Sequence, residues 1–160
     1  MSTHDPLELL KGWEAYCTEQ SDLHVTSRRY YKFLSRMLFI PACVLGSASG
    51  VSSITVASSD TFSIIFGAMS IASAAMFSLH AKTGLDEKDF LHDQYCRNFY
   101  ILANDIKAQL ALHATGVWAY KSVSDYAREC KQRLDILIDK APSIPGRIAS
   151  GRRCHVTEMC

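Results

Sequence analysis

Apolar residues follow a helical period over the first 36 residues of the chain. Asp5, Pro6 and Glu8 form a typical helix start, because Asp caps free backbone N–H groups and Pro suits the first helical position. The apolar stripe then recurs at steps of three or four residues, apart from one longer step at Gln20: Leu9, Trp13, Tyr16, Leu23, Ser27, Tyr30 and Leu34. This spacing predicts an amphipathic helix over residues 1–36 that meets no breaker before Pro41.

The middle of the chain consists of two uncharged runs. Residues 37–59 contain 23 uncharged positions and residues 61–81 contain 21. Helices of these lengths measure about 35 Å and 31 Å, enough to cross a hydrocarbon core of about 30 Å. We predict a two-helix transmembrane hairpin over residues 37–81. The alternative is a soluble helical bundle, because the runs contain seven and five Ser/Thr residues.

Two further stripes follow the uncharged segment. The first predicts a helix that ends near Gly116: Leu91, Tyr95, Phe99, Leu102, Ile106, Leu110 and His113. The second predicts a helix that ends at Pro142: Val123, Tyr126, Cys130, Leu134, Leu137 and Ala141. We expect residues 82–141 to form one bundle with the N-terminal helix, because three amphipathic helices can cover each other's apolar faces. Residues 142–160 form a Pro-bounded basic tail.

Basic residues lie on both flanks of the uncharged segment and are absent where its two runs meet. Asp60 is the single charge between Arg36 and Lys82, and it lies where the two runs meet. The positive-inside bias therefore predicts both termini on the cytosolic side. The expected membrane-interface residues are Arg28, Arg29, Tyr30, Tyr31, Lys32, Arg36 and Lys82. Asp60 is interpreted as a turn residue, with a ring of acids at a pore mouth as the alternative.

Small residues recur at four-residue spacing in both runs. The candidate helix-packing positions are Ala42, Gly46, Gly50, Ser63, Gly67, Ser70, Ala74 and Ser78. Small side chains let helices approach closely in lipid, where no hydrophobic force drives them together. These faces either join the hairpin to itself or join copies into a homo-oligomer, and both interpretations stay open. Pro41 predicts a fixed bend near the membrane boundary, with a hinge as the alternative.

Composition narrows the function classes. The chain has 17 Lys+Arg against 16 Asp+Glu, a balance that argues against general nucleic-acid binding. The six cysteines lack paired short spacing, and we expect no cleavable signal in the polar start, so they are interpreted as small apolar residues in a reducing compartment. Cys154, His155 and Cys160 lack the spacing of a zinc site. Catalytic motifs are also missing, so we expect no enzyme, no cofactor, no metal and no small-molecule substrate.

The pattern around the first run resembles a known family. His24-Val25-Thr26-Ser27, then Tyr31, then Ile40-Pro41 leading to a small-residue span near Gly50, resembles the SLATT superfamily over roughly residues 7–140. Its members are two-transmembrane proteins with soluble helices on both sides of the hairpin. The resemblance implies an oligomeric membrane effector that forms pores in bacterial defence systems. It supplies no catalytic residue, and we expect no fused sensor or nuclease domain.

The Ala141-Pro142-Ser143-Ile144-Pro145 ending is more similar to the versions of this layout in large DNA viruses. The sequence therefore predicts an all-α membrane protein, a transmembrane hairpin with amphipathic soluble helices on one side. The leading functional hypothesis is a structural protein of a virion's internal membrane, a minor capsid component that anchors the membrane to overlying shell proteins. The alternative is a SLATT-like pore-forming effector.

Overall fold

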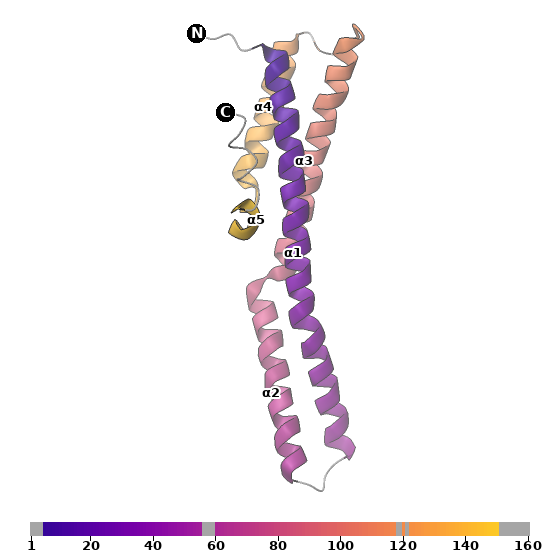
Figure 1. The fold of residues 1–160 in the computed structure, drawn as a ribbon, viewed down its shortest axis with the longest axis vertical. Helices are drawn as coiled ribbons and strands as arrows, with labels where there is room; N and C mark the ends of the chain where they lie inside the picture. The colour runs from indigo at the N-terminus through magenta and orange to yellow at the C-terminus, as the bar shows by residue number, and fades with distance from the viewer. Residues whose placement is uncertain (1–4, 56–59, 118–119, 121, 151–160) are drawn as a thin grey trace. The chain divides into compact units, whose positions relative to one another are not determined.

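The computed structural model describes residues 5–55, 60–117, 120 and 122–150, apart from the side chains of residues 49–55, 60, 149 and 150. All the regular elements in that part of the chain are helices (Figure 1). They are α1 (Pro6–Thr55), α2 (Asp60–Thr83), α3 (Leu85–Ala114), α4 (Val123–Lys140) and the short α5 (Gly146–Ser150). The predicted all-α class is confirmed.

The ends of three helices follow local signals in the sequence. A side-chain oxygen of Asp5 accepts a hydrogen bond from the Leu7 N–H at 3.0 Å, as expected of a cap. Gly116, with a φ of 78°, closes the end of α3, because glycine adopts this left-handed conformation without a steric penalty. Ser122 caps α4 by accepting from the Asp125 N–H at 3.1 Å. The predicted breaks near residues 5, 116 and 142 are confirmed.

Gly84 and Pro41 affect the helices in ways that the hydrophobic pattern alone does not specify. Gly84 has a φ of 57° and separates α2 from α3; the sequence analysis placed a boundary after residue 81 but did not identify this glycine. Pro41 lies inside α1, which continues to Thr55. Proline lacks an N–H, so the carbonyl of Met37 loses its usual helical partner there. The bend expected at Pro41 stays a prediction.

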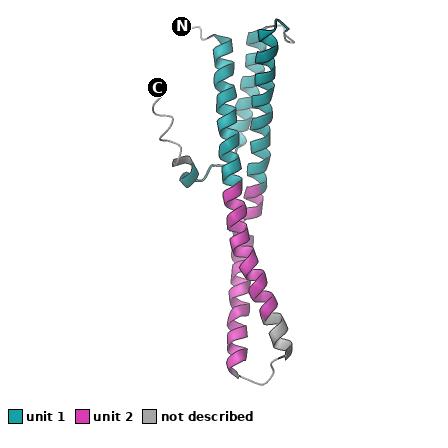
Figure 2. Cartoon of the chain, turned by 45° about the vertical axis from the view of Figure 1, so that its right-hand side comes forward, with its two compact units in different colours: residues 1–28, 90–160 teal, residues 29–89 magenta. Residues whose placement is uncertain are grey.

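The chain divides into two compact units (Figure 2). Unit 1 contains residues 1–28 and 90–160, and unit 2 contains residues 29–89. The divisions fall inside α1 and α3, so each of these helices contributes to both units. The boundaries expected from charge, after residues 36 and 81, both lie within unit 2.

Unit 1 is a bundle built from the first part of α1, most of α3, and α4. Its core contains Leu10, Cys17, Phe99, Leu102, Ala103, Ile106, Tyr126, Ala127, Cys130 and Leu134. The two stripes expected after the uncharged segment supply most of these residues. The N-terminal stripe is partly wrong, because Leu9 and Tyr16 are exposed while their neighbours Leu10 and Cys17 are buried. Consecutive helical residues lie about 100° apart, so the true core face is rotated by one residue from the expected one.

Unit 2 consists mainly of two helices that run side by side, the second part of α1 and α2 (Figure 2). The contacts between them include Ser35 with His80, Phe39 with Phe77, and Ala42 with Ser73. The partner's residue number falls as the α1 number rises, so the two helices are antiparallel. The first turn of α3 completes the unit with Leu85 buried.

Candidate functional site

Between residues 37 and 81, the described outer surface of unit 2 bears no charged side chain and is rich in large apolar ones. The helical run Thr61–Ala114 contains a stretch that is long and apolar enough to cross a membrane, judged by length and composition, and 6% of that stretch is buried. Ile64 and Ile71 of α2 are each 73% exposed, and Val44 and Ile40 of α1 are exposed as well. Such a surface is unfavourable in water, because each exposed Å² of apolar area costs about 25 cal/mol.

α1 and α2 meet through small residues at one point of unit 2. The Ser73 hydroxyl donates a hydrogen bond to the Ala42 carbonyl at 2.7 Å, and both side chains are buried. A Cβ atom added to Gly46 would lie 3.0 Å from the Ser73 hydroxyl oxygen, so a larger residue at this position would require the Ser73 side chain to shift. The contact therefore depends on three small side chains, of which the sequence analysis identified Ala42 and Gly46 but not Ser73.

The remaining candidate packing residues do not take part in this contact. The five positions on α2 are exposed: Ser63, Gly67, Ser70, Ala74 and Ser78. An added Cβ atom at Gly67 would meet nothing within 4 Å. The surroundings of Gly50 in α1 lie outside the described residues, as do the turn residues 56–59; Asp60 is the first residue of α2. One side of α2 thus carries small residues that no other described part of unit 2 covers.

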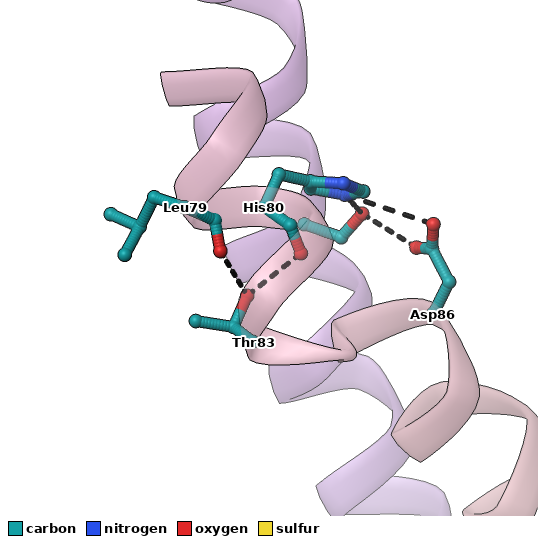
Figure 3. Close-up of polar contacts among 5 residues, drawn as sticks. Leu79, His80, Thr83 and Asp86 are labelled. Carbon is teal, nitrogen blue, oxygen red and sulfur yellow. Dashed lines mark hydrogen bonds and ion pairs between the residues drawn. The ribbon is translucent and has the colours of Figure 1, made fainter. Parts of the chain in front are cut away.

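A polar cluster joins three helices at the end of α2 (Figure 3). The Ser35 hydroxyl of α1 lies 2.9 Å from His80 Nε2 and donates to the Asp86 carboxylate at 2.8 Å. The other Asp86 oxygen lies 3.7 Å from the same His80 nitrogen. The left-handed Gly84 interrupts the helix between His80, in the last turn of α2, and Asp86, in the first turn of α3.

This cluster has the residue types of a hydrolase triad but the wrong connectivity. A catalytic histidine uses its two ring nitrogens separately, one for the serine and one for the acid. Here Ser35 and Asp86 both approach His80 Nε2. Beside it, the Thr83 hydroxyl donates to the carbonyls of Leu79 and His80 at 2.9 and 3.0 Å (Figure 3). The arrangement satisfies polar groups at a helix end and fixes the connection from α2 to α3.

The expected interface residues lie in different environments. Arg28 forms an ion pair with Asp93 at 2.7 Å inside unit 1. Lys88 lies over the Tyr31 ring at 5.7 Å, and Tyr30 and Tyr31 contact each other edge to face. The other four, all basic, are exposed on unit 2: Arg29, Lys32, Arg36 and Lys82.

Unit 1 contains a buried histidine pair that the sequence analysis missed. His24 of α1 and His92 of α3 are each 1% exposed, and their Nδ1 atoms lie 2.7 Å apart. Burial, together with the nearby His92, lowers the pKa of His24 to about 4. Neutral His24 can accept an Nδ1–H from His92 or donate its own, according to the tautomer. The spacing could have revealed this pair, because residues seven or fourteen apart lie on the same face of a helix. His24 lies fourteen residues after the core residue Leu10, and His92 lies seven residues before the core residue Phe99.

The buried thiols of unit 1 are held in their protonated form. Burial raises the pKa of Cys17 to about 11, and it also raises the pKa of Cys130. A thiol with a raised pKa is a poor nucleophile and a poor metal ligand at neutral pH. Within the described ranges, no group of three or more His, Cys, Asp or Glu side chains is arranged to hold a metal ion. Cys154, His155 and Cys160 lie outside those ranges.

The geometry thus consists of an exposed apolar surface, one tight helix contact and a fixed helix connection. None of these features distinguishes one family of helical membrane proteins from another, so the resemblance to the SLATT superfamily stays a prediction. A scan against models of protein families, a search of curated proteins and a search of solved structures all find no match to this chain.

Proposed function

We propose that this chain is a non-enzymatic integral membrane protein, in which α2 and the second part of α1 form a transmembrane hairpin. Unit 1 is then a helical bundle in the aqueous phase, with both termini on the cytosolic side. The observation that carries the proposal is the exposure of large apolar side chains along an uncharged helix, with Ile64 and Ile71 each 73% exposed. Lipid tails solvate such side chains, whereas water does not.

The serine and threonine content of the hairpin is compatible with lipid. The Ser47 hydroxyl donates to the Cys43 carbonyl at 2.7 Å, one turn back in the same helix. The Ser73 hydroxyl is paired with the Ala42 carbonyl. A hydroxyl that donates to a backbone carbonyl presents little unpaired polarity to its surroundings, so these residues cost less in lipid than their type suggests.

The hairpin serves as an anchor in this proposal, and unit 1 serves as the docking surface for other proteins of a membrane-associated assembly. Between α3 and α4, unit 1 has an open groove of about 240 Å³ lined by apolar residues that include Ile101, Leu102 and Ile136. The resemblance of residues 141–145 to viral versions of the layout supports a virion's internal membrane as the setting, with shell proteins as partners.

A pore-forming effector is the second candidate. It is favoured by the exposed small residues of α2, which leave one side of the hairpin available for close packing with other copies: Ser63, Gly67, Ser70, Ala74 and Ser78. Dye release from sealed vesicles separates the two candidates. An anchor leaves the vesicles tight, whereas a pore releases the dye in proportion to the oligomer formed.

Cysteine labelling tests the hairpin itself. Cys43 is exposed on the surface of α1 but lies within the proposed membrane span, whereas Ser124 is exposed on α4 of unit 1. The full chain, with Cys154 and Cys160 replaced by serine, is reconstituted into phosphatidylcholine vesicles with and without Ser124→Cys. We expect a charged maleimide to label the thiol introduced at position 124 quickly and to leave Cys43 unlabelled until detergent is added. Equal labelling of both thiols in intact vesicles contradicts the proposal.

A further inference from the structure

The segment of α1 that enters unit 2 has a one-sided charge distribution. From Leu23 to its end at Thr55, α1 contains four basic residues and no acidic residue. Arg28 is engaged with Asp93. Arg29, Lys32 and Arg36 are exposed, and none of the ion pairs formed among the described residues involves them. These three side chains, the α1 basic face, are therefore three cations without a counter-charge in the part of the chain that the structure describes.

The α1 basic face continues directly into an apolar surface. Arg29, Phe33, Arg36 and Ile40 follow one another at steps of four, three and four residues, which places them on a single face of the helix. Phe33 is 62% exposed and Ile40 is 57% exposed. Cations therefore alternate with apolar side chains at first, and from Met37 onward the face is uncharged.

The α1 basic face is long enough to span a lipid headgroup layer. Seven residues separate Arg29 from Arg36, which is about 10 Å along a helix. The headgroup region of one leaflet is about 5–8 Å thick, as the difference between a whole bilayer and its hydrocarbon core shows. A helix whose uncharged part begins at Met37 thus holds Lys32 and Arg36 at the depth of the phosphates.

We infer that the α1 basic face binds the headgroups of anionic phospholipids, an inference that rests on the proposed membrane hairpin. Arginine forms paired hydrogen bonds with phosphate oxygens, and lysine adds a point charge. Apart from Asp60 at the start of α2, the acids of unit 2 lie on α3: Asp86, which accepts a hydrogen bond from Ser35, Glu87, and Asp89, which also has partners. An anionic headgroup is favoured over a zwitterionic one because it leaves a net negative charge for the cations, worth about fivefold in affinity for each cation near the surface.

Spin-labelled lipids measure this preference directly. The full chain is reconstituted into phosphatidylcholine vesicles that contain a trace of spin-labelled phosphatidylglycerol or spin-labelled phosphatidylcholine. Electron paramagnetic resonance then gives the ratio of their association constants at the protein surface. We expect a ratio of about five in low salt that falls towards one in 1 M salt, because salt screens exposed charges.

A matched pair of variants locates the effect. The triple variant Arg29→Gln, Lys32→Gln and Arg36→Gln is expected to bring the ratio to about one. The control Lys107→Gln, Arg128→Gln and Lys131→Gln removes three exposed cations of unit 1 and is expected to leave the ratio unchanged. A wild-type ratio of one, or an equal loss in both triple variants, overturns the inference while the hairpin stands. A chain that alkaline carbonate strips from the vesicles overturns the hairpin itself.

Discussion

The two units differ in where they place large apolar side chains. Among the residues whose side chains the structure describes, all but two of the buried hydrophobic ones lie in unit 1, and the exceptions in unit 2 are Ala42 and Leu85. Unit 2 instead exposes its large apolar side chains and places the polar Ser73 between its helices. A bundle that hides its apolar residues is suited to water, and a helix pair that exposes them is suited to lipid. Under the proposed function, one chain contains helices suited to two solvents.

The same substitution in the two units provides the strongest test of this contrast. Ile106 is fully buried in the core of unit 1, whereas Ile71 is 73% exposed on α2. Ile106→Ala is expected to lower the free energy of unfolding by about 2–5 kcal/mol, because it leaves a cavity. Ile71→Ala is expected to change it by less than about 0.5 kcal/mol. Circular dichroism of the thermal transition in mild detergent measures both.

The matched control for this comparison is a second exposed isoleucine. Ile136 is exposed on α4 of unit 1, so Ile136→Ala is expected to behave as Ile71→Ala does, although it belongs to the other unit. If Ile71→Ala destabilises the protein as much as Ile106→Ala, then α2 is covered by protein rather than by detergent. That result would contradict the assignment of unit 2 to lipid.

The buried histidine pair makes the stability of unit 1 depend on pH. The pKa of His24 is about 4 in the fold, below its ordinary value of 6.5. The unfolded chain therefore binds more protons between pH 6.5 and pH 4, and stability is lost as the pH falls through that window. By pH 5 the loss amounts to about 2 kcal/mol. Chemical unfolding of the full chain at pH 7.5 and at pH 5 measures it.

A variant without this titration isolates the contribution of His24. Glutamine cannot take up a proton in this range, and its amide can still hydrogen-bond to His92. We therefore expect His24→Gln to be less stable at pH 7.5 but to lose much less stability on going to pH 5. An unchanged pH dependence in His24→Gln would show that other groups cause the loss.

Much of the fold could be predicted from local pattern. The stripes of α3 and α4 gave the buried positions, because Phe99, Ile106, Tyr126 and Leu134 are large and regularly spaced. On α1, apolar residues occupy adjacent positions, so the pattern alone did not decide between Leu9 and Leu10 for the core face. The packing of the other helices against α1 decided it.

The polar contacts could not be predicted from the sequence, because they join residues far apart in the chain. His24 and His92 are 68 positions apart, and Ser35 and Asp86 are 51 apart. The sequence also did not identify Gly84 as the residue between α2 and α3, since an isolated glycine without a nearby proline is tolerated inside many helices. Its left-handed conformation is visible in the structure, and the contact between His80 and Asp86 follows from it.

Removing the hydrogen bond between α1 and α2 is expected to lower the free energy of unfolding by a smaller amount, and this effect is specific to unit 2. Ser73→Ala removes the hydroxyl that donates to the Ala42 carbonyl, at an expected cost of about 1 kcal/mol, since hydrogen bonds between helices in lipid contribute this much. Ser70→Ala is the matched control, because Ser70 is exposed on the same helix. Unfolding in mixed micelles compares them, and equal effects would argue against a specific contact at Ser73.

The smallest expected effect concerns the cluster at the end of α2. Ser35→Ala removes two hydrogen bonds, one with His80 and one with Asp86, but the Asp86 carboxylate is exposed and water replaces its lost partner. We therefore expect a loss of about 0.5 kcal/mol, below that of Ser73→Ala, because the latter leaves a buried carbonyl without the hydroxyl. The two serines of unit 2 thus distinguish a contact between helices from a contact at the water boundary. If Ser35→Ala costs more than Ser73→Ala, the end of α2 is drier than its middle, and the proposed placement of the hairpin in lipid is wrong.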